Sequence, residues 1–107
     1  MHFLVIGQSG PTTFWDYFGF NVPDDKTFVL RWKPEDLQKI GVDEVEMTAT
    51  TTSGSGQPMH EKANITTKLI QFTNFPLNSG FKISMQALRN ETRVIRHILR
   101  LKTYKTG

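Results

Sequence analysis

The most regular pattern in the 107-residue chain is a two-residue alternation between Phe81 and Ala87. Apolar side chains stand at every second position there, and Lys82, Ser84 and Gln86 stand between them. Successive side chains of a β-strand point to opposite faces, so the pattern predicts a strand with one face in a core and one in water. The same period returns near the C-terminus, where Ile95, His97, Leu99 and Leu101 share one face, and a turn around residues 89–91 separates the two strands.

Further strands are predicted upstream. In residues 27–34, TFVLRWKP, alternate apolar residues share a face and Pro34 ends the strand, because proline cannot donate a ladder hydrogen bond. Strands are also predicted at Val42–Thr50, with Glu44 and Glu46 facing outward, at Ile65–Phe72, and at Phe18–Val22. Residues 53–64 read as a loop with at most a short edge strand near Thr51, and Pro34–Ile40 as a single helical turn. Short strands separated by turns predict an antiparallel sandwich or barrel.

Composition limits the function classes. The length suits one domain, the net charge is +3, and the chain is 37% hydrophobic and 21% charged. The absence of cysteine excludes a disulfide scaffold, a thiolate zinc site and a cysteine nucleophile. The longest apolar run, residues 3–6, is too short for a membrane span or a signal-peptide core, so any secretion signal is expected outside this chain.

The order of these segments resembles a fibronectin type III domain between Pro11 and Thr103. The resemblance starts at Phe28-Val-Leu-Arg-Trp32-Lys-Pro34, continues through Val42–Ala49 and Phe75–Ala87, and ends at Leu101-Lys-Thr103. It implies an all-β, antiparallel, seven-stranded β-sandwich of the fibronectin type III and immunoglobulin-like class. The core residues that it implies are Phe28, Leu30, Trp32, Phe81, Ile83 and Met85.

The resemblance also divides the chain. Residues 11–103 are expected to form the domain, and residues 104–107 a C-terminal tail. Residues 1–10 are expected to be an N-terminal extension or residues added to the native chain. Within them, His2–Ile6 reads as an added edge strand, the tail of a preceding module, or added sequence.

Four departures from the family pattern bear on function. Phe81 stands where the family usually has a tyrosine whose hydroxyl binds nearby backbone, and Asn78 replaces the usual turn glycine. There is no Arg-Gly-Asp tripeptide, so an integrin-binding role is not carried over. There is also no Trp-Ser-x-Trp-Ser motif, which argues against a membrane-proximal cytokine-receptor domain.

No catalytic, metal or cofactor site is predicted. The histidines at positions 2, 60 and 97 lack metal-ligand spacing, and a catalytic base would need a nucleophile and an orienting partner nearby. The short acidic clusters fit solvated loops, and outward Glu44 and Glu46 are expected to pair with Lys82 on a neighbouring strand. His97, on an apolar face, reads as a structural histidine.

Basic residues near the C-terminus form the sharpest functional feature. Arg93, Arg96, Arg100 and Lys102 are the predicted polyanion-binding residues, and the last three share one strand face. The plain alternative is that they guard a sheet edge or pair with the acidic strand. Nucleic acid is not expected, because no aromatic residues are interleaved for base stacking.

Two other sequence features could lie at the protein surface and bear on function. Asn64-Ile-Thr66 and Asn90-Glu-Thr92 fit the N-glycosylation pattern beside predicted loops. The early chain is crowded with aromatic residues, among which Trp15 or Tyr17 could be an exposed recognition anchor or could pack against residues 1–6.

Three hypotheses follow. The favoured one is a non-catalytic protein-binding or spacer module of a multidomain cell-surface or matrix protein, an extracellular setting in which the partners are other proteins or neighbouring domains and the parent could be membrane-anchored. The second is a domain that binds heparin-like, sulfated glycans through the basic last strand. The third is an accessory domain of a secreted enzyme.

Overall fold

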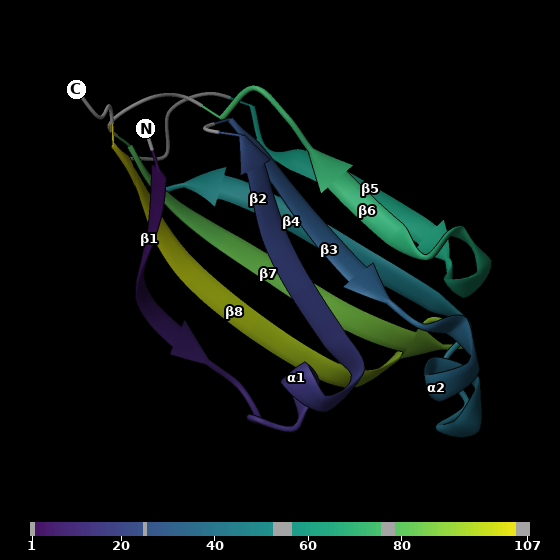
Figure 1. Ribbon diagram of the computed structural model, residues 1–107. Helices are drawn as coiled ribbons and strands as arrows, with labels where there is room; N and C mark the ends of the chain where they lie inside the picture. The colour runs from purple at the N-terminus through teal and green to yellow at the C-terminus, as the bar shows by residue number, and fades with distance from the viewer. Residues whose placement is uncertain (1, 25, 53–56, 76–78, 105–107) are drawn as a thin grey trace.

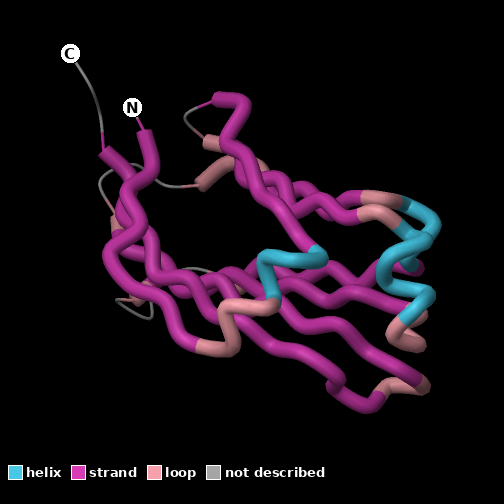
Figure 2. Tube along the Cα trace, turned by 60° about the horizontal axis from the view of Figure 1, so that its bottom comes forward, coloured by secondary structure: helices cyan, strands magenta, loops and turns pink. Residues whose placement is uncertain are grey.

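The computed structural model describes residues 2–24, 26–52, 57–75 and 79–104, which form two antiparallel sheets packed face to face (Figures 1 and 2). The larger sheet has the order β1-β8-β7-β4-β5, with β1 at His2–Ser9, β8 at Thr92–Tyr104, β7 at Gly80–Arg89, β4 at Glu44–Thr51 and β5 at Met59–Asn64. The smaller sheet has the order β2-β3-β6, with β2 at Phe18–Asp24, β3 at Thr27–Trp32 and β6 at Leu69–Phe72. The predicted antiparallel β-sandwich is confirmed.

Short helices connect the two sheets at one end of the sandwich. These are α1 at Phe14–Tyr17, α2 at Pro34–Lys39 and the 3₁₀ helix η1 at Ile65–Thr67. The helical turn expected at residues 34–40 is α2, whereas α1 was not expected from the sequence. Within the described ranges, no helix has the length and apolar character that a membrane crossing requires.

The core lies between the sheets and is formed by the apolar residues that alternate with polar ones in the sequence. The six residues predicted as core are each at most 6% exposed. The Trp32 indole donates a hydrogen bond to the Ile65 carbonyl at 2.7 Å, which satisfies its buried N–H. The ring of Phe81 packs edge-on against Phe75, with centroids 4.9 Å apart, so burial and an aromatic contact hold the position where the family has a tyrosine. Asn78 lies outside the described residues.

The hairpin of β7 and β8 forms the centre of the larger sheet. Arg89 pairs with Thr92 across a two-residue turn, Asn90–Glu91, in which both residues have positive φ (48° and 65°). A type I′ turn requires this geometry and matches the twist of the strands that it joins. The turn expected at residues 89–91 is therefore present, at the point where the apolar alternation of β7 ends.

Two expectations were wrong. Residues 59–64, expected within a loop, form β5, which pairs with β4 along its whole length. The strand expected at Ile65–Phe72 is interrupted, because residues 65–67 form η1 and Lys68 adopts a left-handed conformation (φ 72°) before β6 begins. Asn64 starts η1 by accepting a hydrogen bond from the Thr66 backbone N–H at 3.0 Å, and this cap competes with strand continuation.

The N-terminal residues provide an eighth strand. β1 runs antiparallel to β8, from the His2–Tyr104 pair to the Ser9–Ile98 pair, with a bulge between Val5 and Gly7. Of the alternatives for residues 2–6, the structure contains the added edge strand. Figure 1 shows β1 as the outermost strand of the larger sheet, beside β8 and opposite the β5 edge.

Candidate binding surface

The outer face of the larger sheet carries the basic residues singled out in the sequence. The strand register places Lys82 opposite Arg100, Gln86 opposite Arg96 and Gly80 opposite Lys102. The side chains of Arg93, Arg96, Arg100 and Lys102 are all exposed. Arg96, Arg100 and Lys102 have the opposite parity on β8 to His97, Leu99 and Leu101, which are buried in the core, while Arg93 pairs with Leu88 beyond a register shift.

In the half of this face that β7 and β8 form, the positive charge has little local compensation. In the described residues, no carboxylate oxygen lies within 4.0 Å of a charged nitrogen of Lys82, Arg93, Arg96 or Arg100. Arg96 makes a long hydrogen bond, from Nε to the Ser84 hydroxyl at 3.3 Å. Lys82 and Arg100 are register partners across β7 and β8, which is an unfavourable arrangement for two like charges.

In the half of the face that β4 and β5 form, side chains of β5 pair with the glutamates of β4. Glu46 contacts His60 Nε2 at 2.7 Å and accepts a hydrogen bond from Gln86, while Glu44 lies 3.6 Å from the Lys62 ammonium group. The hydrogen bond with His60 is the main cause that lowers the pKa of Glu46. The expected partner Lys82 stands opposite Thr50 instead, so the pairing expected for Glu44 and Glu46 was wrong.

The pairing of Glu44 and Glu46 was predicted wrongly because β5 was not predicted as a strand. Its apolar positions, Met59 and Ala63, enclose an exposed Glu61, so the strand shows no continuous alternation. The available signal was the mixed charge pattern His-Glu-Lys at residues 60–62, which is typical of a protected sheet edge.

Arg89, the last residue of β7, has a structural role. Its Nε donates to the Gly41 carbonyl at 3.3 Å, and its Nη2 donates to the Ile40 carbonyl. Gly41 has φ +79°, and the guanidinium group covers the carbonyls at the C-terminal end of α2. Arg89 is therefore engaged at the helix end.

His97 is buried and bound to the N-terminal strand. Its Nε2 lies 2.9 Å from Gln8 Oε1, which also accepts a hydrogen bond from the Trp15 indole at 3.3 Å. An indole N–H can only donate, so the shared Gln8 oxygen accepts from both rings and the His97 proton is on Nε2. Nδ1 is buried without a well-formed hydrogen bond. Burial lowers the pKa of His97, against a weaker raising effect of the Pro11 carbonyl.

Trp15 and Tyr17, the candidate recognition anchors, are both half-buried. Trp15 packs against Phe14, Phe20 and His97, with ring centroids 4.9–5.3 Å apart. Its indole is tied to Gln8 of β1, which favours a packing role over recognition. Gln8 is a residue that sequence reasoning missed, since its partner is 89 positions away.

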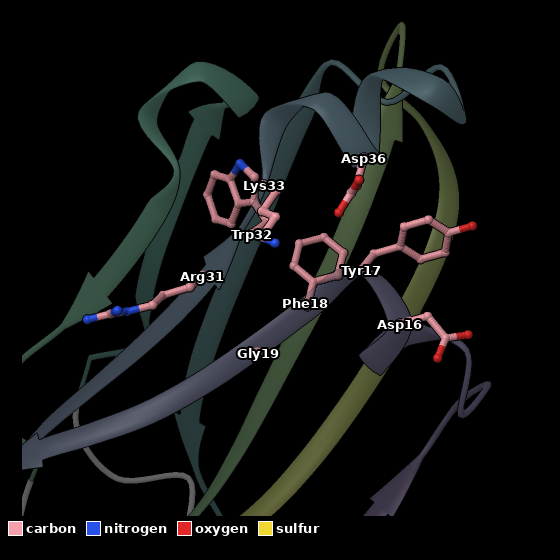
Figure 3. A pocket seen from close by; sticks show the side chains of 8 residues that line it. All are labelled: Asp16, Tyr17, Phe18, Gly19, Arg31, Trp32, Lys33 and Asp36. Atoms are coloured by element: carbon pink, nitrogen blue, oxygen red, sulfur yellow. The ribbon is translucent and has the colours of Figure 1, made fainter.

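Tyr17 lines an open hollow of about 420 Å³ at the helical end of the sandwich. Figure 3 shows Phe18 between Trp32 and Tyr17, with Asp36 above them. Charges of both signs surround the hollow, from Asp16, Arg31, Lys33 and Asp36, and no histidine lines it. Elsewhere in the described ranges, no three acidic or histidine side chains gather as a metal-binding group.

The two sequons lie at the surface. Asn64 is exposed at the start of η1, and Asn90 is exposed in the hairpin turn, where its backbone N–H binds an Asp43 carboxylate oxygen at 3.3 Å.

No protein-family model matches the chain, and no curated protein matches it in sequence. Solved structures do match it. The fn3 domain of the human collagen alpha-1(XX) chain superposes with a TM-score of 0.61 at 14% identity, over 95% of this chain and 90% of that chain. The fn3 domain of human contactin 1 gives 0.60 at 10% identity, over 97% and 87%.

The FN5 domain of Drosophila Lar gives a TM-score of 0.55 at 13% identity, over 84% of this chain and 92% of that chain. At these identities, the likeness concerns the fold. The order of strands that suggested the resemblance in the sequence is thus matched in space, and the chain has the fold of a fibronectin type III domain.

Proposed function

We propose that the chain is a non-catalytic, protein-binding module of a multidomain cell-surface or matrix protein. The fold supports this proposal, because fibronectin type III domains are typically modules of multidomain extracellular proteins. The outer face of the larger sheet is the proposed binding surface, and an acidic surface of another protein or of a neighbouring domain is its proposed partner.

The observation that carries the proposal is the direct opposition of Lys82 and Arg100 without a carboxylate nearby in the described residues. A like-charged cross-strand pair costs up to about 1 kcal/mol relative to neutral residues. An anionic partner would remove this repulsion and gain two charge-assisted contacts. A plain spacer would gain nothing from keeping the two charges opposite each other.

A sulfated glycan is the second candidate partner. Arg96, Arg100 and Lys102 point to one side of a single strand, whose rise is about 3.3 Å per residue, so their charges follow a line about 20 Å long. A linear polyanion could follow such a line, whereas a compact anion would meet only two of these side chains.

Retention on immobilised heparin, compared with a cation exchanger of matched charge, separates the partners. The variant is Arg96→Ser with Arg100→Ser, and the matched control is Arg31→Ser with Lys39→Ser, which removes two exposed cations elsewhere. Elution from heparin at distinctly higher salt, lost in the variant only, would favour the glycan. Equal elution on both resins would leave an acidic protein surface as the partner, and equal losses in variant and control would refute a localised binding surface.

Glycan occupancy tests the extracellular setting independently. The chain, secreted from animal cells, should carry N-glycans at Asn64 and Asn90, because both side chains are exposed. Mass spectrometry before and after glycosidase treatment measures the occupancy of each site. Secreted material unmodified at both positions would contradict the proposed setting.

A further inference from the structure

The four edges of the two sheets differ in their protection against pairing with another strand. β5 exposes the charged residues Glu61 and Lys62, β2 contains Pro23 and ends in Asp24, and β6 has only four residues. Charged residues, proline and short length are the usual devices that block edge pairing. β1 has eight residues with no lysine, arginine, acidic residue or proline. Its one device is the bulge between Val5 and Gly7.

β1 also presents apolar surface at its edge. Val5 pairs with the buried Leu101, so it belongs to the face of the sheet that is turned toward the core, yet it is 41% exposed. Ile6, at the bulge, is 53% exposed. A further strand beside β1 would find a continuation of the core on one of its faces and unpaired backbone groups along its length.

The other face of such a strand would meet Arg100. Gly7 stands opposite Arg100, and both Cβ and Cδ of Arg100 lie 3.9 Å from the position that a Cβ on Gly7 would take. The arginine side chain therefore extends over β1 through the space that the missing side chain leaves. The guanidinium group follows Cδ, and the next strand position is only about 4.8 Å beyond β1. An added strand would thus place its outward side chains beside this cation.

We propose that the free edge of β1 binds an extended segment of a partner protein, one that alternates apolar residues with aspartate or glutamate. Backbone hydrogen bonds to β1 would supply pairing, the apolar residues would cover Val5, and a carboxylate would pair with Arg100. A second copy of this chain fits less well, because β1 carries no acidic residue and pairing two copies would bring two basic β8 strands toward each other. The proposal rests on the chain being a binding module and names the chemistry of its partner.

The probe is an eight-residue peptide of alternating valine and glutamate with blocked ends, and the comparison peptide has lysine in place of glutamate. Val5→Lys should weaken binding of the first peptide at least about tenfold, because the new charge would be covered by the added strand. The matched control is Leu69→Lys, which puts the same charge on the β6 edge at a residue of equal exposure (42%). Arg100→Ser should weaken binding up to about fivefold, as one exposed ion pair does, and Arg93→Ser, beyond the paired part of β1, should not.

Amide NMR shifts locate the peptide, and they separate this proposal from binding to the outer face. The amides of residues 5–9 should shift with the glutamate peptide, and heparin retention of Val5→Lys should equal that of the unchanged chain. No binding at millimolar peptide, equal losses for Val5→Lys and Leu69→Lys, or equal affinity for both peptides would overturn the proposal. A dimer in sedimentation that Val5→Lys dissociates would also overturn it, because the occupant would then be a second copy.

Discussion

The hydrogen bond between Gln8 and His97 should hold the N-terminal strand to the core. His97 is 2% exposed, and Nδ1 already lacks a well-formed hydrogen bond, so Gln8→Ala would leave neither ring nitrogen with a protein partner of good geometry. A buried polar group left unsatisfied costs about 1–3 kcal/mol. Trp15 also loses its acceptor, but its indole is only half-buried, so water can replace the Gln8 oxygen at little cost.

We therefore expect Gln8→Ala to lower the free energy of unfolding by about 2 kcal/mol. In a domain of this size, each 1 kcal/mol lowers Tm by roughly 4–8 °C. Urea unfolding followed by circular dichroism measures the first quantity, and a thermal melt measures the second. Ser9→Ala, one residue away and exposed, is the control and should change the free energy by less than about 0.5 kcal/mol.

A double-mutant cycle with His97→Phe tests the cause. Phenylalanine can keep the stacking on Phe14, whose ring centroid is 5.2 Å from that of His97, and it removes both ring nitrogens. Gln8→Ala should then cost less than about 0.5 kcal/mol in the His97→Phe background. If the two changes are additive, the loss comes from packing of β1 and the reasoning from the unsatisfied ring is refuted.

Three further predictions concern the stability of the fold. Between pH 7.5 and 5, the free energy of unfolding should fall as the pH falls below 6.5, because the unfolded chain binds a proton at His97 while burial lowers the pKa of the folded ring. In urea unfolding, His97→Phe should remove up to about 1.4 kcal/mol per pH unit of this slope. A slope that is the same in the variant would contradict this prediction. Gly41→Ala should destabilise by about 1–3 kcal/mol, since φ is +79° and the new Cβ would displace the Arg89 guanidinium group from the Ile40 and Gly41 carbonyls; a melt with unchanged Tm would contradict this. Trp32→Phe should cost about 0.5–1.5 kcal/mol by removing the indole hydrogen bond to the Ile65 carbonyl, which keeps its backbone hydrogen bond from the Lys68 N–H at 3.3 Å; an unchanged free energy of unfolding in denaturant would contradict this.

The central strands could be predicted from the sequence because their burial is one-sided. Phe81, Ile83 and Met85 alternate with polar residues since one face of β7 meets the core and the other meets water, and the family resemblance rests on these positions. The same reasoning failed at the edges. β5 is held by pairing with β4 and by contacts of His60 and Lys62 with glutamates, and these depend on a strand that is distant in sequence.

The N-terminal residues show a second limit. Residues 3–6 form an apolar run that suits an edge strand, a linker or a preceding module equally well. β1 is fixed by its register with β8 and by the contact of Gln8 with His97, and both join residues about 90–100 positions apart. Alternation reports the faces of a strand and carries no information about which strand lies beside it.

The position of β5 decides which cations lie beside the glutamates of β4. With β5 read as a loop, Glu44 and Glu46 had no cation nearer than Lys82, and pairing them would have neutralised the centre of the face. The actual strand order gives both glutamates a partner on β5 and leaves Lys82 opposite Arg100. The outer face is thus divided into a compensated half on β4 and β5 and a positive half on β7 and β8. A net charge of +3 distributed evenly would favour no surface, whereas this division favours an anionic partner at the β8 side, next to β1, the least protected of the described sheet edges.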